Sequence, residues 1–110
     1  MTEQEHAQIR TFIFELPERA RAHEDALRRH QGTAKLVLGE AGVFRATLQE
    51  GQVEVLEGEG PADVTAHMKP EDFLKAMRGR LNWVLALTMG RIKLTGDVSL
   101  LMRLREVFGK

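Results

Sequence analysis

Apolar residues occupy one helical face in the first part of the chain. They recur at the three- and four-residue spacing of an amphipathic helix. These positions are Ile9, Phe12, Ile13 and Leu16. Pro17 interrupts the run, and proline suits the first turn of a new helix. The pattern therefore predicts a helical segment over residues 1–30, broken near Pro17, whose charged second half faces solvent.

The next part of the chain alternates apolar and polar residues with the period of two that is typical of strands. The alternation predicts three strands, over residues 33–38, 43–49 and 52–57. Glycines separate the first two strands, and Glu50-Gly51 makes a tight turn into the third. The positions expected to face inward are Ala34, Leu36, Leu38, Phe44, Ala46, Leu48, Val53 and Val55. This arrangement is a three-strand antiparallel meander.

A glycine-rich loop over residues 58–61 follows the meander, and it cannot easily continue a strand or start a helix. The chain is therefore expected to cross over to a fourth strand at residues 63–68, where apolar and polar residues alternate again. Pro70 then opens a helix that ends near Gly79. Residues 83–87 are apolar, and we interpret them as a short helix packed under the sheet.

The last part of the chain combines a short strand with a capped helix. Gly90 and Gly96 bracket an alternating stretch in which Ile92 and Leu94 face the same way. Asp97 is a good N-cap residue, so a final helix is expected to start directly after it. Apolar residues cover a broad face of that helix, and basic residues lie beside them.

This order of turn, strand, glycine-aspartate and apolar helix resembles the sterol carrier protein 2 (SCP2) lipid-transfer family. The family commonly ends with Gly-Lys-Leu-Lys-Ile-x-Gly-Asp before an aliphatic helix, and residues 90–97 read Gly-Arg-Ile-Lys-Leu-Thr-Gly-Asp. Residues 62–65, Ala-Asp-Val-Thr, are similar to the family's entry into its fourth strand. Residues 71–79 resemble the family's helix that ends in Leu-x-x-Gly.

The resemblance and the pattern together give an α/β (α+β) fold in a single domain over residues 1–110. The expected order is an N-terminal helix, a three-strand antiparallel meander, a crossover to a fourth strand, a helical segment, a fifth strand and a C-terminal helix. Residues 1–30 would be the helical segment, and residues 32–108 would be the sheet and the cavity-forming core. The resemblance further implies a mixed five-stranded sheet with helices on one face.

In the SCP2 family the sheet and its helices enclose a lipid tunnel, with the C-terminal helix as one wall. The resemblance therefore implies non-enzymatic binding or transfer of an apolar lipid, such as a fatty acid, a fatty acyl-CoA or a sterol- or isoprenoid-like molecule. Enclosing a lipid chain stabilises the complex by ~0.8 kcal/mol per methylene group. The residues expected to line the tunnel are Phe73, Met77, Trp83, Leu85, Leu87, Met89, Leu100, Leu101, Leu104 and Phe108.

Charge changes this picture in the C-terminal third. The net charge is zero, but from residue 71 to the end there are eight lysines and arginines against four acids. Arginine pairs well with carboxylates and phosphates. Arg91, Arg103 and Arg105 are therefore candidates to hold a lipid head group or to contact a membrane surface transiently. An ordinary solvated face fits the same residues.

Catalytic and cofactor chemistry has little support in the sequence. Cysteine is absent. The four histidines, His6, His23, His30 and His67, lack the spacing of metal ligands. The one serine, Ser99, has no histidine nearby in sequence to activate it. We therefore expect no enzyme activity, no cofactor and no metal.

Other partners and the compartment follow from composition. The chain has no tyrosine, few aromatic residues and no dense basic cluster, which argues against nucleic-acid binding. No apolar run approaches the ~20 residues that span a bilayer. The lack of cysteine fits a reducing compartment, so we expect a cytoplasmic protein.

A second interpretation stays open. The domain could be an interaction or dimerisation module whose cavity is filled by its own or a partner's side chains, for example to assist lipid or quinone metabolism. An exposed apolar C-terminal helix would then form a homodimer instead of a wall that moves to admit lipid.

Overall fold

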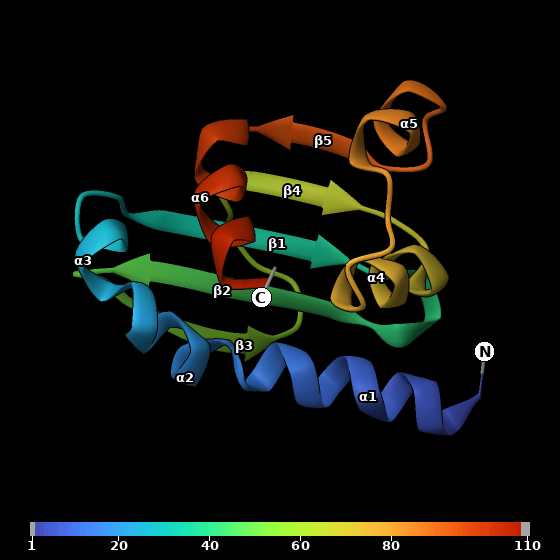
Figure 1. Ribbon diagram of the computed structural model, residues 1–110, viewed down its shortest axis with the longest axis horizontal. Helices are drawn as coiled ribbons and strands as arrows, with labels where there is room; N and C mark the ends of the chain where they lie inside the picture. The colour runs from blue at the N-terminus through green and yellow to red at the C-terminus, as the bar shows by residue number, and fades with distance from the viewer. Residues whose placement is uncertain (1, 109–110) are drawn as a thin grey trace.

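The computed structural model describes residues 2–108 and the side chains of residues 2–105. At its centre is a mixed sheet with the strand order β3-β2-β1-β4-β5 (Figure 1). β1 pairs in parallel with β4, and the other three strand pairs are antiparallel. The strands are β1 (Gly32–Val37), β2 (Val43–Gln49), β3 (Gln52–Glu57), β4 (Val64–His67) and β5 (Lys93–Gly96). The predicted meander, crossover and fifth strand are confirmed.

The β2–β3 hairpin is closed by a turn through Glu50 and Gly51, which have φ values of 54° and 80°. Two successive residues with positive φ form the type I′ turn, whose twist matches that of the flanking strands. Gly51 also lies close to α3 (Glu24–Leu27), because a Cβ atom at this position would be 2.8 Å from the main-chain oxygen of Glu24. Backbone conformation and close approach both require glycine here.

The connection from β3 to β4 crosses the face of the sheet that carries no helix. Arg45 of β2 donates from Nε to the Gly58 carbonyl oxygen at 3.2 Å, and Lys35 of β1 pairs with Glu59 at 2.9 Å. Beyond the crossing, the main-chain N–H of Thr33 donates to the carboxylate of Asp63 at 2.7 Å. These contacts fasten the loop across two strands and place β4 beside β1.

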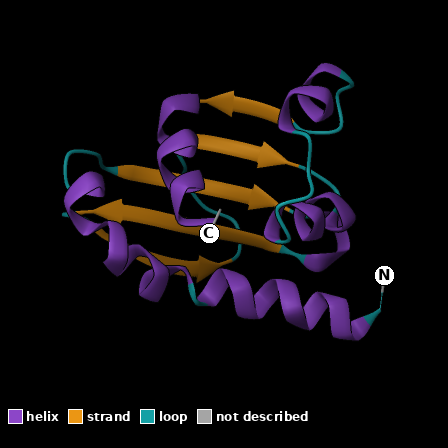
Figure 2. Ribbon diagram, in the orientation of Figure 1, coloured by secondary structure: helices purple, strands orange, loops and turns teal. Residues whose placement is uncertain are grey.

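All helices lie on the other face of the sheet (Figure 2). The α-helices are α1 (Glu3–Phe14), α2 (Leu16–Ala20), α3, α4 (Pro70–Met77), α5 (Trp83–Thr88) and α6 (Val98–Phe108), and the 3-10 turns are η1 (Arg21–His23) and η2 (Gly39–Ala41). α1 packs on α4, where the Phe12 and Phe73 rings meet edge to face at 6.0 Å. α2 contacts β3 and α6, and α6 also contacts β1 and β4. The inward residues of the strands form one apolar core with these helices.

Helix α5 corrects one expectation. The apolar stretch is helical as predicted, but it does not pack under the sheet. Ala86 is its one buried residue, and α5 lies at the corner of the molecule beyond β5 (Figure 1). The inner face over β1 and β4 is covered by α6, so α5 reaches the core only through its inner side, where Trp83 packs against it. No helix in residues 2–108 is both long enough and apolar enough to cross a membrane.

Candidate functional site

A cavity of about 160 Å³ lies between the inner face of the sheet and the helices α4, α5 and α6. Its lining is almost entirely hydrocarbon, with a single cation at its edge. The sheet side contributes Leu36, Ala66, Met68 and Leu94. The helices contribute Phe73, Trp83, Val84, Leu87, Leu101, Met102 and Arg105. Such a site suits an apolar group that carries a polar or anionic end.

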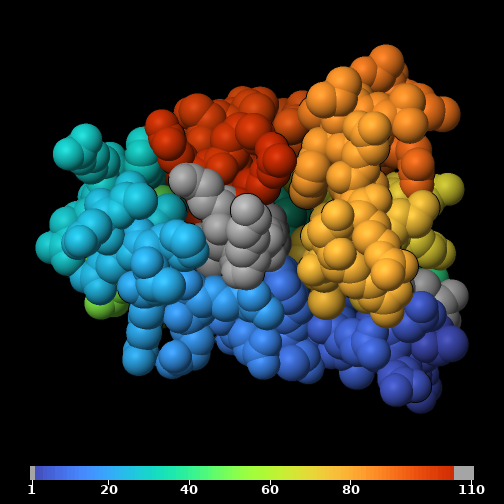
Figure 3. Space-filling view, in the orientation of Figure 1, coloured from blue at the N-terminus to red at the C-terminus, as the bar shows by residue number. Residues whose placement is uncertain are grey.

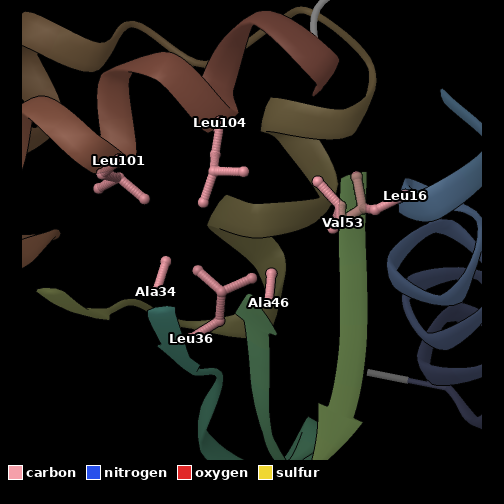
Figure 4. Close-up of a pocket in the computed structure, with 7 residues that line it drawn as sticks. All are labelled: Leu16, Ala34, Leu36, Ala46, Val53, Leu101 and Leu104. Atoms are coloured by element: carbon pink, nitrogen blue, oxygen red, sulfur yellow. The ribbon is translucent and has the colours of Figure 1, made fainter. Parts of the chain in front are cut away.

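A smaller apolar void of about 20 Å³ lies between α6, α2 and the strands of the meander. Figure 4 shows Leu101 and Leu104 pointing down from α6 toward Ala34, Leu36 and Ala46 on the strands. Leu16 and Val53 close its far side. The void has room for about one water-sized probe, but an apolar lining this small gives water no polar partners.

Leu36 and Leu101 line both spaces. They are 5% and 9% exposed, so each is held in the core between the cavity and the void. Together they form the partition between the two spaces. A movement of the Leu101 side chain, or of α6 that carries it, would join the cavity to the void.

The electrostatics of the rim are set by Arg105. Its guanidinium carbon lies 5.3 Å from the centre of the Trp83 ring, which is within cation–π range. Among the side chains that the structure describes, no acidic group forms an ion pair with Arg105. Arg105 therefore presents a positive charge at the edge of an apolar space, without an ion-pair partner among the side chains of residues 2–105.

The family assignment follows from this architecture and from the sequence match. The SCP-2 sterol transfer family matches residues 13–109. The chain belongs to this family. Membership supports lipid binding or transfer in general, and the predicted resemblance to SCP2 is confirmed.

This SCP2-family chain is similar to several individual proteins. Hydroxysteroid dehydrogenase-like protein 2 of Xenopus tropicalis is 32% identical over 92 residues, which are 80% of this chain and 22% of that protein. The chain thus spans about a fifth of the curated relatives that it matches. The solution structure of palmitated SCP2L2 from Aedes aegypti is 26% identical, with a TM-score of 0.66 over 100% of this chain and 96% of that one.

The UbiJ-SCP2 ubiquinone synthesis protein shares the fold. It is 23% identical and has a TM-score of 0.62 over 93% of this chain and 87% of that one.

The tunnel residues expected from sequence fall into three groups in this SCP2-family chain. Those that line the cavity or the void are Phe73, Trp83, Leu87, Leu101 and Leu104. Those that line neither space are Met77, Leu85, Met89 and Leu100. Phe108 ends α6, and its side chain lies outside the described residues.

The three candidate head-group arginines are also separated by the structure. Arg105 lines the rim of the cavity. Arg91 donates through its guanidinium to the carboxylate of Asp72, which is buried in α4. Arg103 is exposed on α6 and does not line the cavity. Arg105 is therefore the arginine best placed to meet a ligand.

Several lining residues were not on the predicted list. On the sheet side the signal was present, because the alternation of the strands already marked Leu36, Ala66, Met68 and Leu94 as facing one way. Met102 belongs to the apolar face expected of the last helix, whereas for Val84 the sequence held no such signal. Val84 is 76% and Met102 48% exposed, and their role depends on how α5 and α6 are placed.

Ser99, the one serine of the chain, is part of the cap of α6. The Ser99 hydroxyl lies 2.6 Å from Asp97 Oδ1, and the main-chain N–H of Ser99 donates to the same oxygen at 3.1 Å. These hydrogen bonds, first the one from the hydroxyl, lower the pKa of Asp97 and cap α6. In the described part of the chain, no group of three or more His, Asp or Glu residues is arranged to hold a metal ion.

Proposed function

We propose that this chain binds a single-chain lipid with an anionic head group, a fatty acid or a derivative of one, and transfers it without catalysing a reaction. The observation that carries the proposal is an apolar cavity whose rim holds one cation, Arg105, with no internal counter-ion among the described side chains. A carboxylate at the rim would pair with Arg105 while the hydrocarbon tail occupies the cavity. A neutral sterol would use the apolar lining but not this charge.

The volume of the cavity limits how much of a lipid tail it can hold. About 160 Å³ is below the roughly 300–1,000 Å³ of typical ligand pockets, so a long tail needs more room than the cavity offers. We propose that the tail displaces Leu101 and continues into the void beneath α6. Each methylene that enters contributes ~0.8 kcal/mol, which offsets the repacking of the partition.

The palmitated SCP2L2 of Aedes aegypti supports a fatty acid as the ligand, because that protein is 26% identical over the full length of this chain. The proposal assigns lipid contact to Phe73, Trp83, Leu87, Leu101 and Leu104, and head-group contact to Arg105. It also includes a single domain over residues 1–110 and a cytoplasmic location.

Native mass spectrometry of the chain purified without detergent, followed by lipid extraction of the same sample, tests the proposal. A retained fatty acid, or saturable displacement of a fluorescent fatty acid by unlabelled fatty acid, is the expected result. A ligand-free mass together with no binding of the fluorescent fatty acid would overturn it.

A second function has its own support. The cavity and the void are small, and several apolar side chains of α5 are exposed, as an assembly module with a self-filled cavity would require. The UbiJ-SCP2 ubiquinone synthesis protein has the same fold. Light scattering after size exclusion, with and without fatty acid, separates the two functions. A carrier is expected to be monomeric or to dissociate when loaded, whereas an assembly module stays dimeric in both conditions.

A further inference from the structure

Helix α5 presents apolar side chains to solvent at one corner of the molecule. Its outer residues Val84, Leu85 and Leu87 and the following Met89 are 76%, 49%, 43% and 64% exposed. Figure 3 shows the orange segment that contains α5 projecting beside the red segment of α6. A cluster of large apolar residues on a short, projecting helix is the kind of surface that marks an interaction site. We call the four residues the α5 tip.

Basic residues flank the α5 tip in the sequence. Residues 78–93 contain four basic residues and no acid, and the basic residues flank the apolar stretch on both sides. They are Arg78, Arg80, Arg91 and Lys93. Arg91 is balanced by its ion pair with Asp72, and Arg78 hydrogen-bonds to Gln8 of α1. Lys93 alternates along β5 with the inward Leu94, so it points to the face without helices. Arg80 is exposed and forms no ion pair among the described side chains. Arg103 and Arg105 of α6 add two more exposed cations, and Arg105 lies over Trp83 at the start of α5.

The α5 tip is continuous with the mouth of the cavity. Val84 and Leu87 are both exposed to solvent and also line the cavity, so they form its outer rim. Leu85 and Met89 are exposed but line neither the cavity nor the void. A surface that covered the α5 tip would therefore cover the mouth through which a ligand passes.

We propose that the α5 tip docks on a lipid bilayer that contains anionic phospholipids. Apolar side chains that project beside the exposed Arg80, Arg103 and Arg105 match the interface of such a bilayer, where the side chains enter the acyl boundary and the cations meet phosphate. A second copy of this chain is a poorer occupant. A symmetric dimer through this patch would set the cations of one copy against those of the other. The inference rests on the proposed function, since docking would open the cavity toward membrane lipid.

Vesicle flotation tests the docking with a matched pair of variants. The probes are vesicles of phosphatidylcholine alone and of phosphatidylcholine with phosphatidylglycerol. Wild type is expected to float with the anionic vesicles, and the double variant Leu85→Ser with Met89→Ser is expected to partition about tenfold less, ~1.4 kcal/mol. Leu56→Ser is the control, because Leu56 is 47% exposed on β3, away from the α5 tip. This control is expected to partition as wild type.

The cations are tested in the same assay. Arg80→Gln is expected to weaken partitioning to anionic vesicles several-fold, ~1 kcal/mol per charge, and to leave the weak partitioning to neutral vesicles unchanged. Arg29→Gln, which removes an exposed arginine between α3 and β1, is the control and is expected to have no effect. Raised salt should weaken wild-type binding because it screens the exposed charges.

Three results would overturn the docking: flotation of the Leu85/Met89 variant equal to that of wild type, no wild-type flotation with anionic vesicles, or a wild-type dimer that the variant abolishes. Fatty-acid binding in solution is measured on the same proteins. Leu85 and Met89 line no internal space, so the variant should bind fatty acid like wild type. Loss of docking with retained binding, and loss of binding with retained docking, therefore separate the two proposals.

Discussion

Arg91 reaches from the turn after α5 to the carboxylate of Asp72 in the first turn of α4. Among the described residues, Asp72 is the one charged side chain that is fully buried, at 1% exposure. A buried carboxylate requires a partner, because an unpaired charge in the core is strongly unfavourable. The pair joins α4 to the segment that leads into β5, and it fixes the position from which α5 projects.

The first prediction concerns this ion pair. Arg91→Gln leaves the carboxylate of Asp72 buried without its charged partner. The loss for a fully buried pair is roughly 3–5 kcal/mol. Because the Arg91 side chain is 40% exposed, we expect a smaller loss in the free energy of unfolding, about 2 kcal/mol. Urea denaturation measures it, with the exposed Arg103→Gln as the neutral control. An unchanged denaturation midpoint for Arg91→Gln would show that the pair contributes nothing.

The second prediction concerns Arg105. If its guanidinium pairs with a ligand carboxylate, Arg105→Gln should weaken fatty-acid binding about tenfold, since a hydrogen bond to a charged group contributes ~1.5 kcal/mol or more. The methyl ester of the same fatty acid has no carboxylate, so its affinity should not change. Competition against a fluorescent fatty acid measures both ligands. Arg103→Gln is the control on the same helix, and an equal loss for acid and ester would argue against a head-group role.

The third prediction concerns the partition between the cavity and the void. Leu101 lines both spaces, so Leu101→Ala removes most of the side chain that separates them and should join the cavity to the void. We expect the preference among saturated fatty acids to move toward longer chains, with a loss of about 2–5 kcal/mol in the free energy of unfolding.

Leu100→Ala provides the matched control for this prediction. Leu100 lies on the same helix and is 4% exposed, but it lines neither space. It should lower stability by a similar amount and leave the chain-length preference unchanged. If Leu101→Ala and Leu100→Ala showed the same preference for fatty-acid chain length, the tail would not pass Leu101.

The fourth prediction concerns the cap of α6. Hydrogen bonds from Ser99 and Leu100 lower the pKa of Asp97 from its usual 3.8. A lowered folded-state pKa stabilises the fold above the unfolded value, and this stabilisation is lost as pH falls through the folded-state pKa. Asp97→Asn keeps a capping oxygen but carries no charge. Wild type should therefore exceed Asp97→Asn in Tm at neutral pH, and the difference should shrink on acidification below 3.8. A Tm difference that is constant over this range would contradict the prediction.

Much of the fold could be predicted from local pattern. The bounds of β2 and β3 agree with the predicted strands at residues 43–49 and 52–57. The predicted strand at 63–68 is shorter in the structure, where β4 is Val64–His67. The difference lies at the strand ends, since Asp63 and Met68 still hydrogen-bond to β1 through their main-chain N–H groups. Strand interiors follow side-chain alternation, whereas strand ends depend on the neighbouring strand.

The site was less predictable than the fold. An apolar residue on a helix is equally consistent with the core, a cavity wall or a membrane-facing tip, because spacing records which residues share a face and not what covers that face. Leu100 and Leu101 are neighbours in sequence and similarly buried, but only Leu101 reaches the cavity. Leu85 and Leu87 differ in the same way on α5.

The sequence by itself determined the elements, the inward face of the strands and the Asp97 cap, because these depend on interactions between residues close together in the chain. It also determined the family, because the family's motifs are short stretches of sequence. The tertiary structure decided the position of α5, the partner of Arg91 and the separation of the cavity from the void. Each of these depends on contacts between segments far apart in sequence, such as Asp72 with Arg91 and Leu36 with Leu101. Their positions follow from how helices of fixed size fill one face of the sheet, so the function proposed for Arg105 and the α5 tip becomes visible only after folding.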